Sequence, residues 1–263
     1  MNTIQPYPIS FSRLKQFKRS PKHLIHYLTE EKDPTPAMKF GSAFHQYVLQ
    51  PLEFPKNYVT APAIDKRTKA GKELHEEFAA ANADKTIIST DDLDKIKLMA
   101  DSLMGNFGAG ELIVNAEAFE LDTRWTDPDY NVDMRGIIDG IGTGYIFDIK
   151  TCPTASPDDF VRYAYSMGIH IQAAIYMDSE AAKTYGVKEY FIIAIEKDAP
   201  FGVSAFKLTD DLINKGRMEY KLMVNEFQQW VEMGMPNNSY DYWNTDHYLP
   251  LDAPRWAKTT EVI

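Results

Sequence analysis

The sequence predicts a single α/β domain in which a central mixed β-sheet of about five strands is flanked by helices. Three strand-like runs lie close together at residues 116–126, 131–139 and 144–150, and turn-forming residues separate them. A further pair of strand-like runs covers 190–196 and 202–208. Segments with helical spacing of apolar residues occur before, between and after these strands, which favours helices on both faces of the sheet.

Composition is that of a folded domain outside a membrane. The chain has 263 residues, 44% of them hydrophobic and 13% aromatic, which suffices for a sizeable core. It has no apolar run long enough to span a bilayer, and its first residues lack the features of a signal peptide. The single cysteine, Cys152, excludes an internal disulfide and an all-cysteine metal site. We therefore expect a cytoplasmic protein with no membrane association.

Three parts are expected along the chain: a basic helical segment at 1–36, a core at 37–235 and a tail at 236–263. The net charge of −10 argues against general attraction to nucleic acid. The cations are nevertheless clustered. The first segment has no acid before Glu30 but contains Arg13, Lys15, Lys18, Arg19 and Lys22, and a second cluster contains Lys66, Arg67, Lys69 and Lys72. Such clusters are either solvated faces or tracks for a phosphate backbone.

The first half of the chain contains several helix signals. Ser10 and the Ser20-Pro21 pair predict two capped helices within 10–29. Apolar spacing predicts helices over 37–50 and 69–82, with irregular, proline-rich chain at 51–66 between them. Thr90 is expected to cap a further helix that runs to about Met104.

The second half contains a short helix near 156–165 and a longer one from Gly168 to near Gly186. Gln172 and Tyr176 are four residues apart in the latter and share one face, as boundary residues of many helices do. Thr209 is expected to cap a long helix to about Met233. Its expected apolar positions are Leu212, Met218, Leu222, Met223, Phe227, Trp230 and Val231.

Charged residues interrupt the apolar run at 145–150. Strand alternation places Ile146, Asp148 and Lys150 on one face and Tyr145, Phe147 and Ile149 on the other. Moving an unpaired carboxylate or ammonium from water into the protein interior costs on the order of several kcal/mol of free energy. A bound cation would account for the acid and a phosphate for the lysine, whereas a structural Asp–Lys pair would account for both.

Three acids follow one another on the predicted strands: Glu120, Asp139 and Asp148. If they converge, they cannot all remain ionised without a counter-ion. Oxygen ligands, with His45 from a preceding helix as a candidate imidazole ligand, suit a hard cation such as Mg²⁺ or Mn²⁺. A single histidine at that position could equally be an ordinary boundary residue. With Lys150 beside the acids, the set favours metal-assisted hydrolysis of a phosphodiester.

These residues resemble the core of the PD-(D/E)XK nucleases, with a restriction-endonuclease-like fold. Glu120, Gly136-Ile137-Ile138-Asp139 and Asp148-Ile149-Lys150 carry the resemblance, although the usual Pro-Asp is absent. Further similarities are Gly41-Ser42-Ala43-Phe44-His45, the basic segment 65–72, Trp125-Thr126-Asp127, and Gln172 with Tyr176. The ordered set is similar to the RecE-type, exonuclease VIII-like branch, commonly phage-encoded, over about residues 37–200.

The resemblance implies a role for each site residue. Asp139 and Asp148 would be the principal metal ligands, with the Ile149 backbone carbonyl as a third oxygen. His45 would complete the shell of one metal, and Glu120 would hold or orient a second metal or a water. Lys150 would be the catalytic lysine, with Gln172 and Tyr176 positioning the scissile phosphate or terminal nucleotide. Candidate DNA contacts are Lys66, Arg67, Lys69 and Arg13.

The resemblance also implies an activity and partners. Such an enzyme digests linear double-stranded DNA from its 5′ ends and leaves a 3′ strand for a RecT-like single-strand annealing protein. It would use Mg²⁺, with Mn²⁺ able to substitute, and two ions in each active site. A ring-shaped homo-oligomer, a trimer or tetramer, would place the clustered cations in a central channel. A phage-encoded protein would act in the cytosol of its bacterial host.

Other functions remain open at this stage. One is a different PD-(D/E)XK enzyme, such as an endonuclease or a RecB-like module; relatives with an iron–sulfur cluster would need four cysteines. Another is a non-catalytic DNA-end-binding protein, for which the retained acids and lysine have no evident use. A third, a phosphohydrolase of small molecules, leaves the basic segments unexplained.

Overall fold

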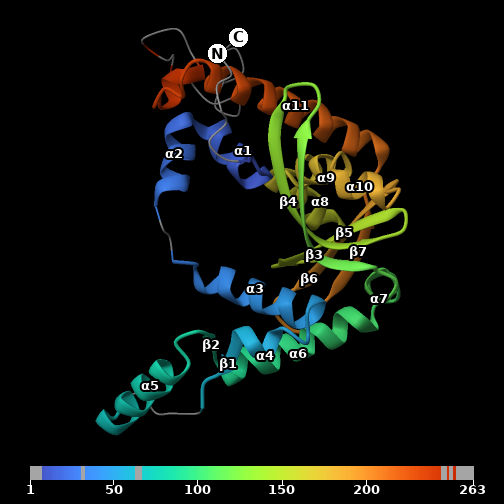
Figure 1. The fold of residues 1–263 in the computed structure, drawn as a ribbon. Coiled ribbons are helices and arrows are strands. Elements are labelled where there is room, and N and C mark those ends of the chain that lie inside the picture. Colours follow the sequence, from blue (N-terminus) through green and yellow to red (C-terminus); the bar gives the residue numbers. More distant parts are fainter. Residues whose placement is uncertain (1–7, 31–32, 63–66, 244–247, 249–250, 253–263) are drawn as a thin grey trace, which may run out of the picture.

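The protein is described by a computed structural model that places residues 8–30, 33–62, 67–243, 248 and 251–252 (Figure 1). Its five-stranded sheet has the order β3-β4-β5-β6-β7, in which β5 and β6 are parallel and the other neighbours antiparallel. The strands are β3 (Ala118–Asp127), β4 (Val132–Gly142), β5 (Tyr145–Cys152), β6 (Glu189–Glu196) and β7 (Val203–Lys207). The mixed five-stranded sheet predicted from the sequence is therefore confirmed.

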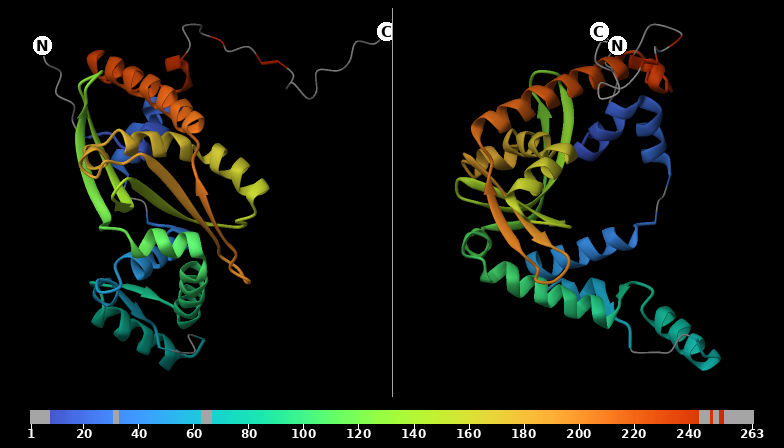
Figure 2. Two further views of the ribbon diagram at one scale, coloured as in Figure 1. Left: turned by 90° about the vertical axis from the view of Figure 1, so that its right-hand side faces the viewer. Right: turned by 180° about the vertical axis from the view of Figure 1, so that it is seen from behind.

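Helices cover both faces of this sheet, as predicted. Figure 2 shows α8 to α11 on one side and α3, α6 and α7 on the other. The helices are α1 (Phe11–Arg19), α2 (Pro21–Thr29), α3 (Pro36–Leu49), α4 (Phe54–Asn57), α5 (Lys69–Ala81), α6 (Thr90–Gly105), α7 (Phe107–Val114), α8 (Pro157–Met167), α9 (Ile169–Met177), α10 (Glu180–Thr184) and α11 (Asp210–Glu232). Among the described residues, none of these helices combines the length and apolar character needed to cross a bilayer.

The first face of the sheet packs against α1, α9 and α11. Phe17 of α1 lies 5.5 Å from Phe227 and 5.4 Å from Trp230, both on α11, measured between ring centroids. Two of the apolar positions expected on α11 are wrong, because Met218 is 71% and Leu222 62% exposed. Residues missed in that prediction, Ile213, Tyr220 and Val224, are buried instead.

The second face packs against α3 and α6. Alternate residues of β5 and β6, including Phe147, Ile149 and Ile193, are fully buried there with Phe44 of α3 and Met99 of α6. The alternation expected for 145–150 is thus observed, since Ile146 packs in the cluster of the opposite face. Consequently the two faces of β5 meet different helices.

The N-terminal helix pair is confirmed together with both of its caps. The Ser10 hydroxyl accepts from Arg13 N–H, and the Ser20 hydroxyl accepts from His23 N–H. Ile9 precedes α1 and forms a parallel bridge to Met134 of β4, in which Ile9 N–H donates to Asp133 O at 2.7 Å. This bridge fixes the start of α1 against β4.

The structure corrects several element predictions. The helix expected from 168 to 186 is two helices, α9 and α10, because Ser179 is buried at the junction, where it donates to Tyr176 O and caps α10. The stretch 51–66, expected to be irregular, contains α4 and β1 (Tyr58–Thr60), and β1 pairs in parallel with the unpredicted β2 (Thr86–Ile88). The helix α7 was also missed. The residue that caps α6 is Ser89 and not Thr90.

Close packing of α9 on α11 generates a stability prediction. A Cβ at Gly216 of α11 would lie 2.1 Å from the backbone oxygen of His170, whereas a Cβ at Gly105, the last residue of α6, meets no atom within 4 Å. Gly216→Ala should lower the free energy of unfolding by about 1–3 kcal/mol, as overpacking does, despite the better helix propensity of alanine. Urea unfolding measures this change, with Gly105→Ala as the control, and equal stability of the two variants would contradict it.

Candidate metal and active site

The site forms where β4 and β5 separate. These strands pair only through Gly140–Gly142 and Tyr145–Phe147, and beyond that point β5 pairs with β6 alone. There the Asp139 carboxylate replaces the β4 backbone as a hydrogen-bond acceptor, because Ile149 N–H donates to Asp139 Oδ2 at 2.8 Å. The separation thus leaves room beside β5 for side chains from several elements.

Glu120 enters this space from β3 through an unusual backbone conformation. Its φ is +49°, in the left-handed region that residues other than glycine rarely adopt. The β3–β4 pairing includes Phe119 with Gly140 and Leu121 with Ile138, but it skips Glu120 and Asp139 between them. Such strain persists only where the surroundings enforce it and often marks a functional site.

His45 of α3 completes a cluster with these two acids. Its Nδ1 lies 3.5 Å from Asp139 Oδ2 and 3.9 Å from Glu120 Oε1. One ligand atom from each of the three residues lies within 4.8 Å of the others, a spacing that could hold a metal ion. All three side chains are half-buried.

Asp148 and Lys150 lie on the opposite face of β5 from Ile149 and meet α9. Lys150 Nζ donates to Asp148 Oδ1 at 2.9 Å, and Gln172 Nε2 donates to the same oxygen at 3.2 Å and to Tyr176 Oη at 3.3 Å. Asp148 Oδ2 is 2.7 Å from Lys150 Nζ, but this contact lacks hydrogen-bond geometry, so the buried oxygen has no hydrogen-bond partner among the described residues. A deeply buried carboxylate oxygen in that state is costly unless something else binds it.

The crowded acids influence one another's protonation. Burial raises the pKa of Asp148 to about 6 even though Lys150 acts to lower it, and the neighbouring Asp139 adds a smaller upward effect. Burial, followed by the neighbouring Asp139, also raises the pKa of Glu120. For Lys150, burial acts to lower the pKa, but the Asp148 and Asp139 carboxylates raise it above its ordinary value. The lysine therefore stays charged while the acids resist ionisation.

The donor set fits a hard divalent cation. Glu120, Asp139 and Asp148 offer carboxylate oxygens and His45 an imidazole nitrogen. The N–H and C=O of a strand residue face the same neighbour, so the Ile149 carbonyl also faces the space beside β5. An added positive charge would lower the raised pKa values of Glu120 and Asp148, and it would give the Asp148 oxygen that lacks a hydrogen bond a second charged neighbour besides Lys150.

The predicted site residues fall into two groups. The structure brings together His45, Glu120, Asp139, Asp148, Lys150, Gln172 and Tyr176. Arg13 is nearby, since it lines a cavity of about 360 Å³ with Gln172 and Tyr176. Arg67 and Lys69, by contrast, lie at α5, which projects beyond α6 away from the five-stranded sheet (Figure 1). Lys66 lies outside the described residues.

Residues that the sequence reasoning missed also border the site. Phe11, Tyr27 and Arg135 line the same cavity as Arg13. Gly136 lies directly beneath Tyr176, because a Cβ there would be 2.5 Å from the tyrosine Cε1. A glycine inside a strand is a recognised sign of such close approach, so this position could have been found.

Comparisons with known proteins agree with this fold. A solved structure of a "Putative exonuclease" from Eubacterium rectale matches with a TM-score of 0.60 and 14% identity, covering 93% of this chain and 91% of that one. A structure of SSO0001 aligns over 89% of each chain at 15% identity, but its TM-score of 0.31 carries no weight. No curated protein gives a significant match.

The fold and the acidic site thus define a protein of the PD-(D/E)XK nuclease superfamily. A family profile described as "PDDEXK-like domain of unknown function (DUF3799)" matches residues 10–239, most of the chain. The chain belongs to this PDDEXK-like family.

Metal binding should stabilise the protein more at pH 8 than at pH 5. The raised pKa of Asp148 means that this residue contributes stability that is complete below about pH 4 and is lost as the pH rises through about 6, and the raised pKa of Glu120 acts in the same direction. A bound cation offsets that loss. At a hundredfold excess over Kd it contributes about 2.7 kcal/mol, or roughly 5–10 °C in Tm for a chain of this size.

Thermal melts with Mn²⁺ or Mg²⁺ against EDTA measure this effect. Asp148→Asn should lose most of the metal-induced shift and flatten its pH dependence. Asp122→Asn is the matched control, because Asp122 is on β3 near Glu120 but is exposed and paired with Arg135. An unchanged shift in Asp148→Asn would remove this residue from the metal site.

Proposed function

We propose that the protein is a Mg²⁺-dependent exodeoxyribonuclease of the RecE type. It hydrolyses linear double-stranded DNA in the 5′→3′ direction and leaves 3′ single-strand overhangs for strand-annealing recombination. The observation that carries this proposal is the convergence of Glu120, Asp139, Asp148 and Lys150, with one buried Asp148 oxygen left without a hydrogen bond. A purely structural ion pair would not need the additional acids.

Each site residue has a role that its contacts support. Asp139, Asp148, His45, Glu120 and the Ile149 carbonyl would hold Mg²⁺ ions, two in each active site, with Mn²⁺ as a substitute. Bound there, a divalent cation supplies positive charge to the phosphoryl oxygens and helps a water molecule to lose its proton.

The remaining residues act on the phosphate and the water. Lys150 is held against Asp148 and keeps its proton, so its ammonium can orient the attacking water or neutralise charge on the phosphoryl oxygen. Gln172 is held between Asp148 and Tyr176, which fixes its amide for positioning the scissile phosphate. Burial raises the pKa of Tyr176 to about 12, so its hydroxyl remains a hydrogen-bond donor.

Double-stranded DNA ends are the proposed substrate. The structural neighbour from Eubacterium rectale carries the name "Putative exonuclease", and α1 presents cations to the cavities beside Lys150. On a chain with a net charge of −10, a ring-shaped trimer or tetramer would gather these cations around a threaded duplex. A RecT-like annealing protein would then receive the 3′ strand. A mass of about 30 kDa in light scattering, that of the monomer, would contradict the ring.

Two alternatives lead to different products. An endonuclease or RecB-like module of the same superfamily would cut closed circular DNA as well as linear DNA. A non-catalytic DNA-end-binding protein would bind ends and degrade neither.

One test of this function measures the degradation of linear and of covalently closed circular DNA, each with Mg²⁺ or with EDTA. The wild type should degrade only the linear form and only with Mg²⁺. Lys150→Ala should lower kcat roughly 10²–10³-fold, as does loss of one transition-state donor, while DNA and metal binding persist. Lys207→Ala is the control, because Lys207 is also a strand lysine paired with a carboxylate, that of Glu189, at the surface.

The outcomes separate the three functions. Cleavage of the circle would favour the endonuclease, and binding without degradation would favour the end-binding protein. Near-normal turnover by Lys150→Ala would exclude this lysine from the mechanism.

A second prediction concerns direction. On a duplex labelled at one 5′ end, the label should appear in short products at once, whereas a 3′ label on the same strand should stay in long products until digestion ends. Gel electrophoresis of timed samples measures both, and the reverse order would contradict 5′→3′ digestion.

A further inference from the structure

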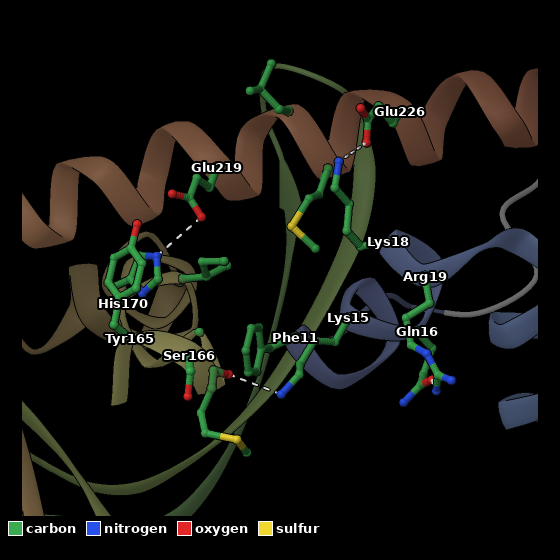
Figure 3. Close-up of a pocket in the computed structure, with 15 residues that line it drawn as sticks. Phe11, Lys15, Gln16, Lys18, Arg19, Tyr165, Ser166, His170, Glu219 and Glu226 are labelled. Carbon is green, nitrogen blue, oxygen red and sulfur yellow. Dashed lines mark hydrogen bonds and ion pairs between the residues drawn. The ribbon is translucent and has the colours of Figure 1, made fainter. Parts of the chain in front are cut away.

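Three adjoining cavities lead from the active site to α11. The first, of about 360 Å³, contains Gln172 and Tyr176, and the second, of about 400 Å³, contains Lys150 and Gln172. The third, of about 620 Å³, lies between α1, the end of α8 and α11, and we call it the α1–α11 groove (Figure 3). Phe11, Lys15, Gln16 and Met167 line both the second cavity and the groove, so the two adjoin.

The α1 wall of the groove is basic. Lys15, Lys18 and Arg19 are exposed there, and α1 contains no acid (Figure 3). Lys15 lies at the junction with the second cavity, where its ammonium donates to Met167 O at 3.1 Å. An ammonium has three donors, so this lysine can also bind a phosphate, and a charge-assisted bond to phosphate is stronger than one to a carbonyl.

The α11 wall contains two acids, and both are paired. Glu226 Oε2 lies 3.5 Å from Lys18 Nζ, and Glu219 lies 3.1 Å from Lys215 and 3.3 Å from His170. Because these partners offset the negative charges of Glu226 and Glu219, the positive charges of Lys15 and Arg19 dominate the groove. The groove therefore suits an anion despite the acidic chain.

Exposed apolar side chains lie between the two walls. Tyr165 is 48% and Met167 41% exposed, and Leu222 of α11 is also exposed. The Tyr165 ring stacks on His170, with centroids 4.6 Å apart and planes within 2°, which holds it rigidly at the groove. Cations beside fixed, exposed aromatic rings are the means by which proteins bind unpaired nucleic-acid bases.

We propose that the α1–α11 groove binds single-stranded DNA, namely the unpaired segment continuous with the strand at Lys150. This inference rests on the proposed nuclease function and assigns a binding surface to its substrate. Stacking on Tyr165 requires an unpaired base, which favours a single strand over a duplex in the groove. A phosphate of the strand takes the place of the Met167 carbonyl on Lys15.

The test measures binding of short fluorescent DNA, single-stranded and duplex, to the full chain by anisotropy in EDTA, where no degradation occurs. Lys15→Ala should weaken single-strand binding roughly tenfold, the loss of one charge-assisted hydrogen bond. It should also reduce the slope of log affinity against log salt by about one. Tyr165→Ala should weaken single-strand binding roughly five- to hundredfold and leave the slope unchanged.

Lys22→Ala is the matched control, because Lys22 belongs to the same basic segment but lines none of the three cavities. It should bind single-stranded DNA like the wild type, and in Lys15→Ala and Tyr165→Ala the loss of affinity should be larger for single-stranded than for duplex DNA. Thermal melts verify folding, and Lys15, being exposed, provides a variant that folds even if Tyr165→Ala does not.

Three results would overturn the proposal. One is unaltered single-strand binding by Lys15→Ala and Tyr165→Ala. Another is an equal loss of duplex binding, which would assign the groove to the duplex backbone. The third is an equal loss in Lys22→Ala, which would show general charge attraction. Because no cleavage is involved, failure of the groove is distinguishable from failure of the nuclease activity.

Discussion

Repulsion among the carboxylates of Glu120, Asp139 and Asp148 is the constraint on which this site depends. Burial and the neighbouring Asp139 carboxylate raise the pKa values of Glu120 and Asp148, so ionising these two acids is costly. Other groups offset part of this cost. Each stabilising group comes from a different element: the Ile149 amide from β5, the His45 ring from α3 and the Gln172 amide from α9. The site therefore assembles only when these elements pack together, and a cation bound among the acids would reduce their mutual repulsion.

The layered packing determines how these groups reach one point. Strand β5 is buried on both faces, so its alternate residues project toward two different sets of helices. Separation of β4 from β5 then gives the Asp139 side chain access to the β5 backbone. On the other face, small residues let α9 lie close to α11, since Gly216 meets the His170 backbone directly, and this fixes Gln172 over Asp148. Catalytic geometry and core packing consequently involve the same contacts.

Much of the fold could be predicted because its signals are local. Capping residues marked the ends of α1, α2 and α11, and strand alternation correctly separated Asp148 and Lys150 from Ile149. Features that depend on distant neighbours were not predictable, such as the left-handed Glu120, the break at Ser179 and the β1–β2 pairing. The structural Asp–Lys pair considered for Asp148 does form, but a second acid and the Gln172 amide accompany it, and one Asp148 oxygen lacks a hydrogen bond. Clusters of charged residues in the sequence did not predict where those residues lie relative to the site. Arg13 lies beside it, whereas Lys69 lies on the remote helix α5.

The bridge between Ile9 and β4 has a consequence for the behaviour of the chain in concentrated solution. The part of β4 that precedes Gly140 pairs with β3 on one side but not with β5 on the other. Exposed strand edges of this kind promote pairing between molecules. Ile9 covers part of this edge, with hydrogen bonds to the backbone of Asp133 and from Arg135. The segment that positions α1 over the active site thus also shields the sheet from self-association. A displacement of α1 that pulled Ile9 away from β4 would expose an unpaired strand edge. Selection for solubility would therefore oppose large movements of this helix.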